Sequence, residues 1–126
     1  MQDLRPTIES AWENRDLLKE SATQQAIRAV VSALDSGELR VAEPTSNGWK
    51  VNEWVKKAVV LYFPIQQMET IEVSPFEFHD KIPLKTGYAA KGVRVVSHAI
   101  ARHGAFLARG VILLLSYVNI GPSVDS

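Results

Sequence analysis

The sequence has no cysteine among its 126 residues. Disulfide bridges, thiolate metal ligands and thiol nucleophiles are therefore excluded as sources of stability or chemistry. The chain also has no net charge, because 14 lysines and arginines balance 14 aspartates and glutamates. Without an overall positive field, binding to a nucleic-acid backbone or to an anionic membrane surface is not expected.

Long hydrophobic runs and phosphate-binding loops are also missing. The longest apolar runs, 58–63 and 111–115, are far shorter than the roughly 20 residues that a membrane-spanning helix needs. The start of the chain has neither the basic end nor the apolar stretch of a signal peptide. The glycines of the second half have neither the spacing nor the strand-to-helix setting of a phosphate loop. These absences favour a protein of the reducing cytoplasm.

Apolar residues three or four positions apart predict three helices in the first half of the chain. A short one covers residues 4–12. The second begins at Ser21 as N-cap, with a capping-box glutamine three residues later, and ends at Gly37. The third is capped by Asn52 and should end at Pro64, because proline removes a helical hydrogen bond.

Strands are predicted where the apolar period changes to two. Residues 39–51 alternate around Asn47-Gly48, and this pair predicts a small hairpin because both residues tolerate positive φ. Residues 65–83 have no clear period, and we expect a loop with one short strand over 70–73. A helical turn should follow at 88–91.

The last quarter of the chain repeats an apolar residue at a strict six-residue interval. The members of this series are Ile100, Phe106, Ile112, Val118 and Val124. Such an interval is typical of a parallel β-helix, in which each hexad forms one short strand of a triangular coil. The repeated residues would then point into the coil. A buried hairpin is the alternative.

Few residues offer chemistry on their own. The three histidines at 79, 98 and 103 lack the helix and glutamate of a zinc protease, and we interpret them as solvent-facing or turn residues, so no metal site is predicted. The tryptophans at 12, 49 and 54 are interpreted as core or interface residues, and Lys56 and Lys57 as the solvent side of the third helix.

Arg94 lies between two valines, just before the hexads. If Val93 and Val95 face inward, Arg94 projects from the opposite side of a strand, where a guanidinium can grip a carboxylate in a bidentate manner. An ordinary solvated arginine is the alternative on this pattern alone.

Several segments, in order along the chain, resemble the amino-terminal half of the tetrahydrodipicolinate N-succinyltransferase family. These segments are LDSGELRVAE, VNEWVKKAVVLYFPI, FHDKIPLK, KGVRVV and ARHGAFLARGVILLLSYVNIG. The most specific of them is SYVNIG with the VD pair that follows it.

The resemblance implies a helical amino-terminal domain followed by a left-handed parallel β-helix. We therefore expect an α+β fold in which residues 1–96 form the helical domain with its hairpin. Residues 97–126 would form the first one to two coils of the left-handed β-helix. The family resembles other hexapeptide-repeat acyltransferases, which are homotrimers with active sites between neighbouring prisms, so a homotrimer is expected.

The implied activity is transfer of a succinyl group to the amino group of ring-opened tetrahydrodipicolinate, a dicarboxylate, in diaminopimelate and lysine synthesis. Succinyl-CoA would serve as a co-substrate, and no tightly bound cofactor is expected. Positioning of the amine beside the thioester and neutralisation of the carboxylates should supply much of the catalysis. By position, Arg94 corresponds to the family arginine that binds the acyl acceptor.

The sequence also departs from the family pattern. Leu113-Leu114-Leu115 stands where the family usually reads Leu-Met-Pro, and the family's partner aspartate lies in a later hexad, so that Asp125 is a different position. No catalytic residue is therefore predicted. The chain reaches about one and a half coils, whereas solenoids usually need at least three repeats. We expect a truncated portion that is inactive alone, or alternatively a non-enzymatic paralogue that acts as an oligomerisation or interaction module.

Overall fold

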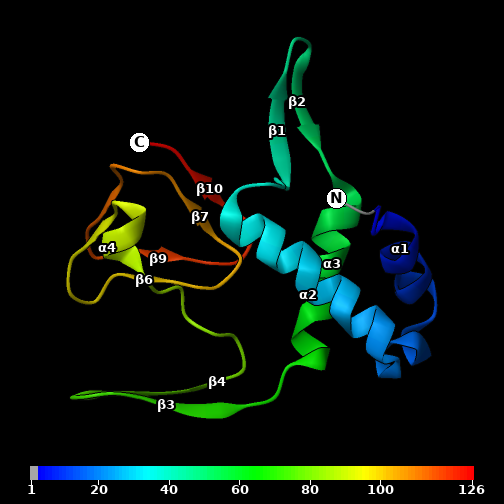
Figure 1. The fold of residues 1–126 in the computed structure, drawn as a ribbon, viewed down its shortest axis with the longest axis horizontal. Helices are drawn as coiled ribbons and strands as arrows, with labels where there is room; N and C mark the ends of the chain where they lie inside the picture. The colour runs from blue at the N-terminus through cyan, green and yellow to red at the C-terminus, as the bar shows by residue number, and fades with distance from the viewer. Residues whose placement is uncertain (1–2) are drawn as a thin grey trace.

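The protein has an α+β fold in the computed structural model, which describes residues 3–126. Its helices are α1 (Arg5–Glu13), the 3-10 helix η1 (Arg15–Lys19), α2 (Ser21–Ser36), α3 (Glu53–Ile65) and α4 (Tyr88–Lys91). Figure 1 shows α1, α2 and α3 packed together on one side of the molecule, with α4 and most of the short carboxy-terminal strands on the other. The α+β class predicted from the sequence is confirmed.

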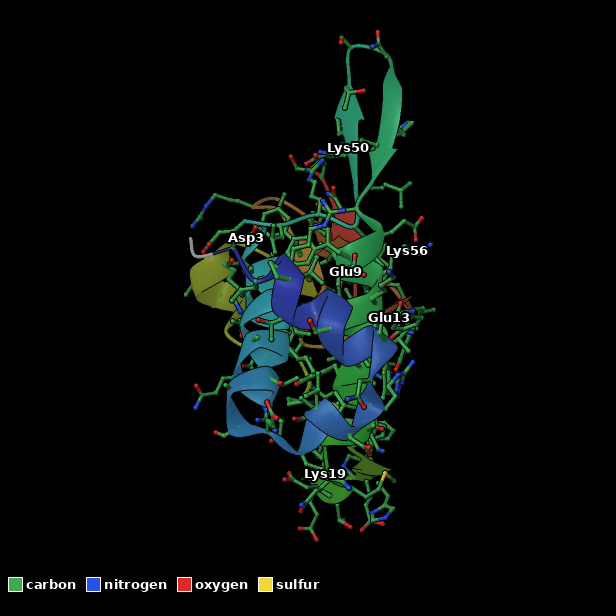
Figure 2. All side chains as sticks on the ribbon, turned by 90° about the vertical axis from the view of Figure 1, so that its right-hand side faces the viewer. Asp3, Glu9, Glu13, Lys19, Lys50 and Lys56 are labelled. Atoms are coloured by element: carbon green, nitrogen blue, oxygen red, sulfur yellow. The ribbon has the colours of Figure 1, made fainter. Side chains whose placement is uncertain are left out.

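The three longer helices enclose the larger of two hydrophobic cores. Ile8 of α1, Ile27 and Leu34 of α2, and Leu61 of α3 are all essentially inaccessible to solvent. Figure 2 shows charged side chains, including Glu9 and Glu13, along the outer side of α1. Burying apolar side chains from three helices at once stabilises an arrangement that no single short helix would hold.

The ends of the helices agree with the sequence prediction to within one residue. α2 ends where Gly37 adopts the left-handed conformation, with φ 83°. Ser21 is the first helical residue rather than the N-cap, and the backbone of Glu20 occupies the cap position. α3 continues for one residue beyond Pro64, because a proline in the last turn interrupts little of the hydrogen bonding that remains.

Two antiparallel hairpins branch from the helical layer. Strands β1 (Ala42–Thr45) and β2 (Gly48–Val51) form the expected one, which projects away from the body in Figure 1. Strands β3 (Glu69–Val73) and β4 (Phe76–Asp80) form a second. The prediction of one strand and a loop in this region was wrong, because β4 pairs along its whole length with β3.

Six strands of two residues each follow, and they pair in parallel. The strands are β5 (Arg94–Val95), β6 (Ile100–Ala101), β7 (Phe106–Leu107), β8 (Ile112–Leu113), β9 (Tyr117–Val118) and β10 (Ser123–Val124). β5 pairs with β8, β6 with β9, and β7 with β10. Successive strands therefore lie on three different sides, and each pairs with the strand three places further along the chain.

The side chains that face the interior of these strands differ from the predicted series. The second residue of each strand points inward, so that Ala101, Leu107 and Leu113 are buried together with Val118. Ile112 is instead 55% exposed. The predicted inward positions were therefore wrong by one residue for the first three hexads and right for Val118 and for Val124, which packs against this core. The interval shortens from six residues to five after Leu113, which brings the two series into agreement.

Leu115, at the corner between β8 and β9, offers a test of backbone strain. It has φ 43° and is 80% exposed, although left-handed backbone costs an L-residue roughly 1–2 kcal/mol. We expect Leu115→Gly to raise the free energy of unfolding by about 0.5–1 kcal/mol, since glycine adopts this conformation without a steric penalty. Urea denaturation measures the change. Leu114→Gly, at a neighbouring exposed position without positive φ, should lower stability. Equal changes in both variants would show that the Leu115 backbone is not strained.

Candidate functional site

Arg94 lies on the outer side of β5. Its neighbours Val93 and Val95 point toward the smaller core, where Val93 is 6% exposed. The Arg94 backbone N–H donates to the carbonyl of Val111 at 3.0 Å, and the residue stands opposite Ile112 of β8. The strand therefore directs this guanidinium outward, and the Arg94 side chain itself is exposed.

The paired strands β5 to β10 are called the coil below. The side of the coil that carries Arg94 is open, unlike the other two sides. Next to β7, Gly37 at the end of α2 lies close to the ring of Phe106. Next to β6, Arg102 donates to the Asp80 carboxylate of β4 at 2.8 Å. The β5–β8 side instead exposes Ile112, and the corner after it exposes Leu114 to 65%. An exposed cation with apolar neighbours forms a surface suited to a ligand that carries both carboxylate and aliphatic groups.

Two more cationic side chains lie close to β5. Lys91, at the end of α4, donates from its ammonium group to the carbonyl of Thr86 at 2.5 Å. Arg109 donates to the carbonyl of Ala90 at 3.2 Å. Within residues 3–126, neither of these side chains nor that of Arg94 forms an ion pair with a carboxylate. The surface around the start of β5 is therefore locally positive although the chain as a whole is neutral.

A buried charged cluster joins the end of α2 to the coil. The ammonium of Lys85, whose side chain is 2% exposed, lies 2.7 Å from the Asp35 carboxylate. The same carboxylate accepts the backbone N–H of Gly104 at 3.0 Å and lies 3.4 Å from Nδ1 of His103. The cluster links three segments that are distant in the sequence, and it fixes the helical layer against the coil.

Burial and hydrogen-bond donors act in opposite directions on the pKa of Asp35. Burial alone would raise the pKa of this carboxyl group, since a buried charge loses its hydration. The donors of His103, Lys85 and Gly104 outweigh that effect and hold the pKa of Asp35 well below its usual range. Asp35 is thus an anion at neutral pH, and it compensates a buried ammonium rather than acting as a general base.

The three histidines lie in different parts of the structure. The histidines do not converge, because His79 contacts Thr70 in the second hairpin, His98 stacks edge-on against Phe76, and His103 belongs to the Asp35 cluster. No group of metal-binding side chains occurs within residues 3–126. None of the helices in that range has both the length and the apolar character of a membrane span.

The structure changes two interpretations made from the sequence and adds one cluster that the sequence did not indicate. Trp12 and Trp54 pack against the larger core as expected, but Trp49 on β2 is 72% exposed. Lys57 is half-buried and its ammonium lies 2.6 Å from the Glu9 carboxylate of α1, whereas Lys56 is exposed and pairs with Glu53 at 3.3 Å. The Asp35 cluster was missed, because a single aspartate and a distant lysine carry no local signal in the sequence.

Comparison of the sequence with known proteins identifies a family. Residues 3–65 match the family described as tetrahydrodipicolinate N-succinyltransferase N-terminal. The 2,3,4,5-tetrahydropyridine-2,6-dicarboxylate N-succinyltransferase of Bordetella petrii is 47% identical over 94% of this chain and 47% of its own length. The proteins of the same name from Paracidovorax citrulli and Pseudoalteromonas translucida are 47% and 43% identical, over 95% and 96% of this chain.

The chain spans about half the length of the curated relatives that it matches. The matches to the Bordetella petrii and Pseudoalteromonas translucida relatives cover 94% and 96% of this chain. The amino-terminal match and the agreement with full-length relatives lead to one conclusion. The chain belongs to the tetrahydrodipicolinate N-succinyltransferase family.

Proposed function

We propose that this chain supplies the acceptor-binding part of an N-succinyltransferase of diaminopimelate and lysine synthesis. The acyl donor would be succinyl-CoA, and the acceptor the amino group of ring-opened tetrahydrodipicolinate. The amine attacks the thioester carbonyl, an amide bond forms, the carbon–sulfur bond breaks, and the CoA thiol leaves with a proton. This assignment draws on the family membership and on the name of the relatives, which includes the dicarboxylate.

The position of Arg94 is the observation that carries the proposal. Its guanidinium projects from a strand whose neighbouring valines point toward the core, so the backbone fixes its direction. A guanidinium binds a carboxylate through two parallel hydrogen bonds, which orients the ligand as well as holding it. Arg94 would therefore hold one acceptor carboxylate and so place the amine beside the thioester, which is how positioning contributes to the rate.

The architecture that we propose around this site is a left-handed parallel β-helix. The parallel pairing of β5, β6 and β7 with β8, β9 and β10 supports it, because two stacked triangular coils pair in this way. The proposed division into residues 1–96 and 97–126 leaves β5 on the helical side although it pairs with β8. We further propose a cytoplasmic homotrimer, in which the exposed Leu114 and Leu115 would contact a second copy.

A chimera tests the function. Residues 1–126 are joined to the second half of the Bordetella petrii relative, and release of the CoA thiol from succinyl-CoA is followed with and without the acceptor. We expect acceptor-dependent release. We also expect Arg94→Ala to lower kcat/KM for the acceptor about 100-fold or more, since two charge-assisted hydrogen bonds are lost.

Arg15→Ala serves as the matched control, because Arg15 is an exposed arginine of η1 that lies over the ring of Trp12, away from the coil. It should leave the kinetics of the chimera unchanged. Arg94→Lys should recover only part of the lost activity, because an ammonium lacks the planar fork. Full activity in Arg94→Ala would refute the assigned role of this residue, and a chimera without acceptor-dependent release would refute the proposed function.

A further inference from the structure

The proposed acceptor carries two carboxylates, and Arg94 can hold only one of them in a bidentate manner. We infer that Arg109 and Lys91 hold the second carboxylate in the small cavity between α4 and the end of α2. This inference rests on the proposed function and identifies the part of the site that would distinguish a dicarboxylate from a monocarboxylate.

The cavity has a volume of about 200 Å³, and its polar lining is mainly cationic. Lys85, Lys91 and Arg109 line it, together with the apolar side chains of Phe106 and Leu107. Among residues 3–126, Asp35 is the acidic residue that lines the cavity. Its charge is already compensated, because the Lys85 ammonium lies 2.7 Å away. The positive charges of Lys91 and Arg109 therefore remain available to an incoming anion.

The guanidinium of Arg109 is held in a fixed place. One of its nitrogens donates to the carbonyl of Ala90, which leaves further N–H donors free. It packs directly over Gly92, where an added Cβ would come within 2.5 Å of Nη1. Gly92 is therefore required for this arrangement, both for the close approach and for its left-handed backbone at φ 69°. A side chain fixed in this way loses little conformational entropy on binding a ligand.

The cavity also lies next to Arg94 along the backbone. Gly92, over which Arg109 packs, precedes Arg94 by two residues. The carbonyl of Gly92 accepts the N–H of Gly110, and Val111 accepts the N–H of Arg94. Arg109 and Arg94 thus belong to two backbone segments joined by hydrogen bonds, so their separation is set by the coil. Two guanidinium groups carried by hydrogen-bonded neighbouring segments suit a ligand with a carboxylate at each end.

Two probes that differ by one carboxylate test this inference on the 126-residue chain. Pyridine-2,6-dicarboxylate and pyridine-2-carboxylate are titrated into the wild-type chain and its variants, and binding is followed by NMR chemical shifts. The wild-type chain should bind the dicarboxylate about tenfold to a hundredfold more tightly, which is the usual effect of one charged hydrogen-bonding partner. Arg109→Ala should remove this preference and leave the affinity for the monocarboxylate unchanged.

Further variants separate this inference from the proposed function. Arg94→Ala should weaken the binding of both probes, whereas Lys91→Met should reduce only the preference for the dicarboxylate. If Arg94→Ala weakens both but Arg109→Ala weakens neither, the second subsite is refuted and the proposed function stands. If Arg109→Ala is selective while Arg94→Ala has no effect, the subsite stands and the role of Arg94 is refuted.

Controls exclude a purely structural explanation. The thermal midpoint of each variant is measured beside its affinities, and Arg15→Ala should behave as the wild-type chain in both. Arg109→Lys should retain part of the preference, because it restores the charge without the fork. Equal affinity of the wild-type chain for the two probes, absence of binding, or an equal loss for both probes in Arg109→Ala would overturn the inference.

Discussion

Asp35→Asn is expected to lower the free energy of unfolding by about 3–5 kcal/mol, since removal of one partner leaves a buried charge uncompensated. The Lys85 ammonium is almost fully buried, and the Asp35 carboxylate is its charged partner at 2.7 Å. Asparagine keeps the size and one acceptor oxygen of the aspartate but loses the negative charge. The buried Lys85 ammonium is then left without its charged partner, which costs stability.

Urea denaturation at neutral pH measures this loss. Asp16→Asn is the matched control, because Asp16 pairs with Lys19 at 3.9 Å on the surface, where both side chains are more than 85% exposed. That variant should leave the urea midpoint unchanged. The double variant Asp35→Leu with Lys85→Met should recover part of the loss, since it replaces the ion pair with apolar contacts. A double variant as unstable as the sum of the two single ones would argue against coupling of the pair.

The dependence of stability on pH follows from the same carboxyl group. The pKa of Asp35 is lower in the folded protein than in the unfolded chain, so the folded state binds its proton less readily. The resulting stability is fully present above the unfolded pKa of about 3.9 and is lost as the pH falls below it, toward the folded value. Asp35→Asn should therefore flatten the acid side of the stability profile. A profile as steep as that of the wild-type chain would show that other carboxyl groups dominate.

The strict six-residue series predicted the short strands that the structure shows, but not the side chains that enter the core. Each of β6, β7 and β8 contains two adjacent apolar residues, so hydrophobicity alone cannot tell which of the two points inward. The large ring of Phe106 instead packs beside Gly37, and the small Ala101 fills the interior of its strand pair. Which residue of each strand points inward depends on the side chains that the helical layer presents to the coil. Those side chains lie far away in the sequence, so a local pattern cannot reveal them.

The second hairpin was missed for a related reason. Only Ile71 and Phe78 are partly buried within its central positions, and they face each other across the two strands. Such a strand has little apolar alternation, because most of its side chains remain in water. The outward direction of Arg94 could be predicted from the sequence because apolar residues flank it, and of these Val93 is buried and Val95 partly buried. The contact of Asp35 with Lys85 instead joins residues far apart and gave no signal.

Gly104→Ala is expected to lower the free energy of unfolding by about 2–5 kcal/mol, as the sum of backbone strain and overpacking. Gly104 has φ 101°, a conformation that alanine adopts only with strain. An added Cβ would also lie 2.7 Å from Cγ2 of Ile120 and 3.0 Å from Cγ1 of Val31. Val31 is fully buried in α2, so it has little room to move away.

Gly48→Ala separates the two contributions. Gly48 has φ 113°, similar to that of Gly104, but no atom lies within 4 Å of its added Cβ. Urea denaturation of this variant therefore reports the backbone strain alone, and the larger loss in Gly104→Ala reports the collision between α2 and the coil. Because the Gly104 N–H also bonds to Asp35, the collision should weaken the charged cluster as well. Equal losses in the two variants would mean that α2 and the coil can separate at this point without cost, and the helical layer would then not fix the coil that carries Arg94.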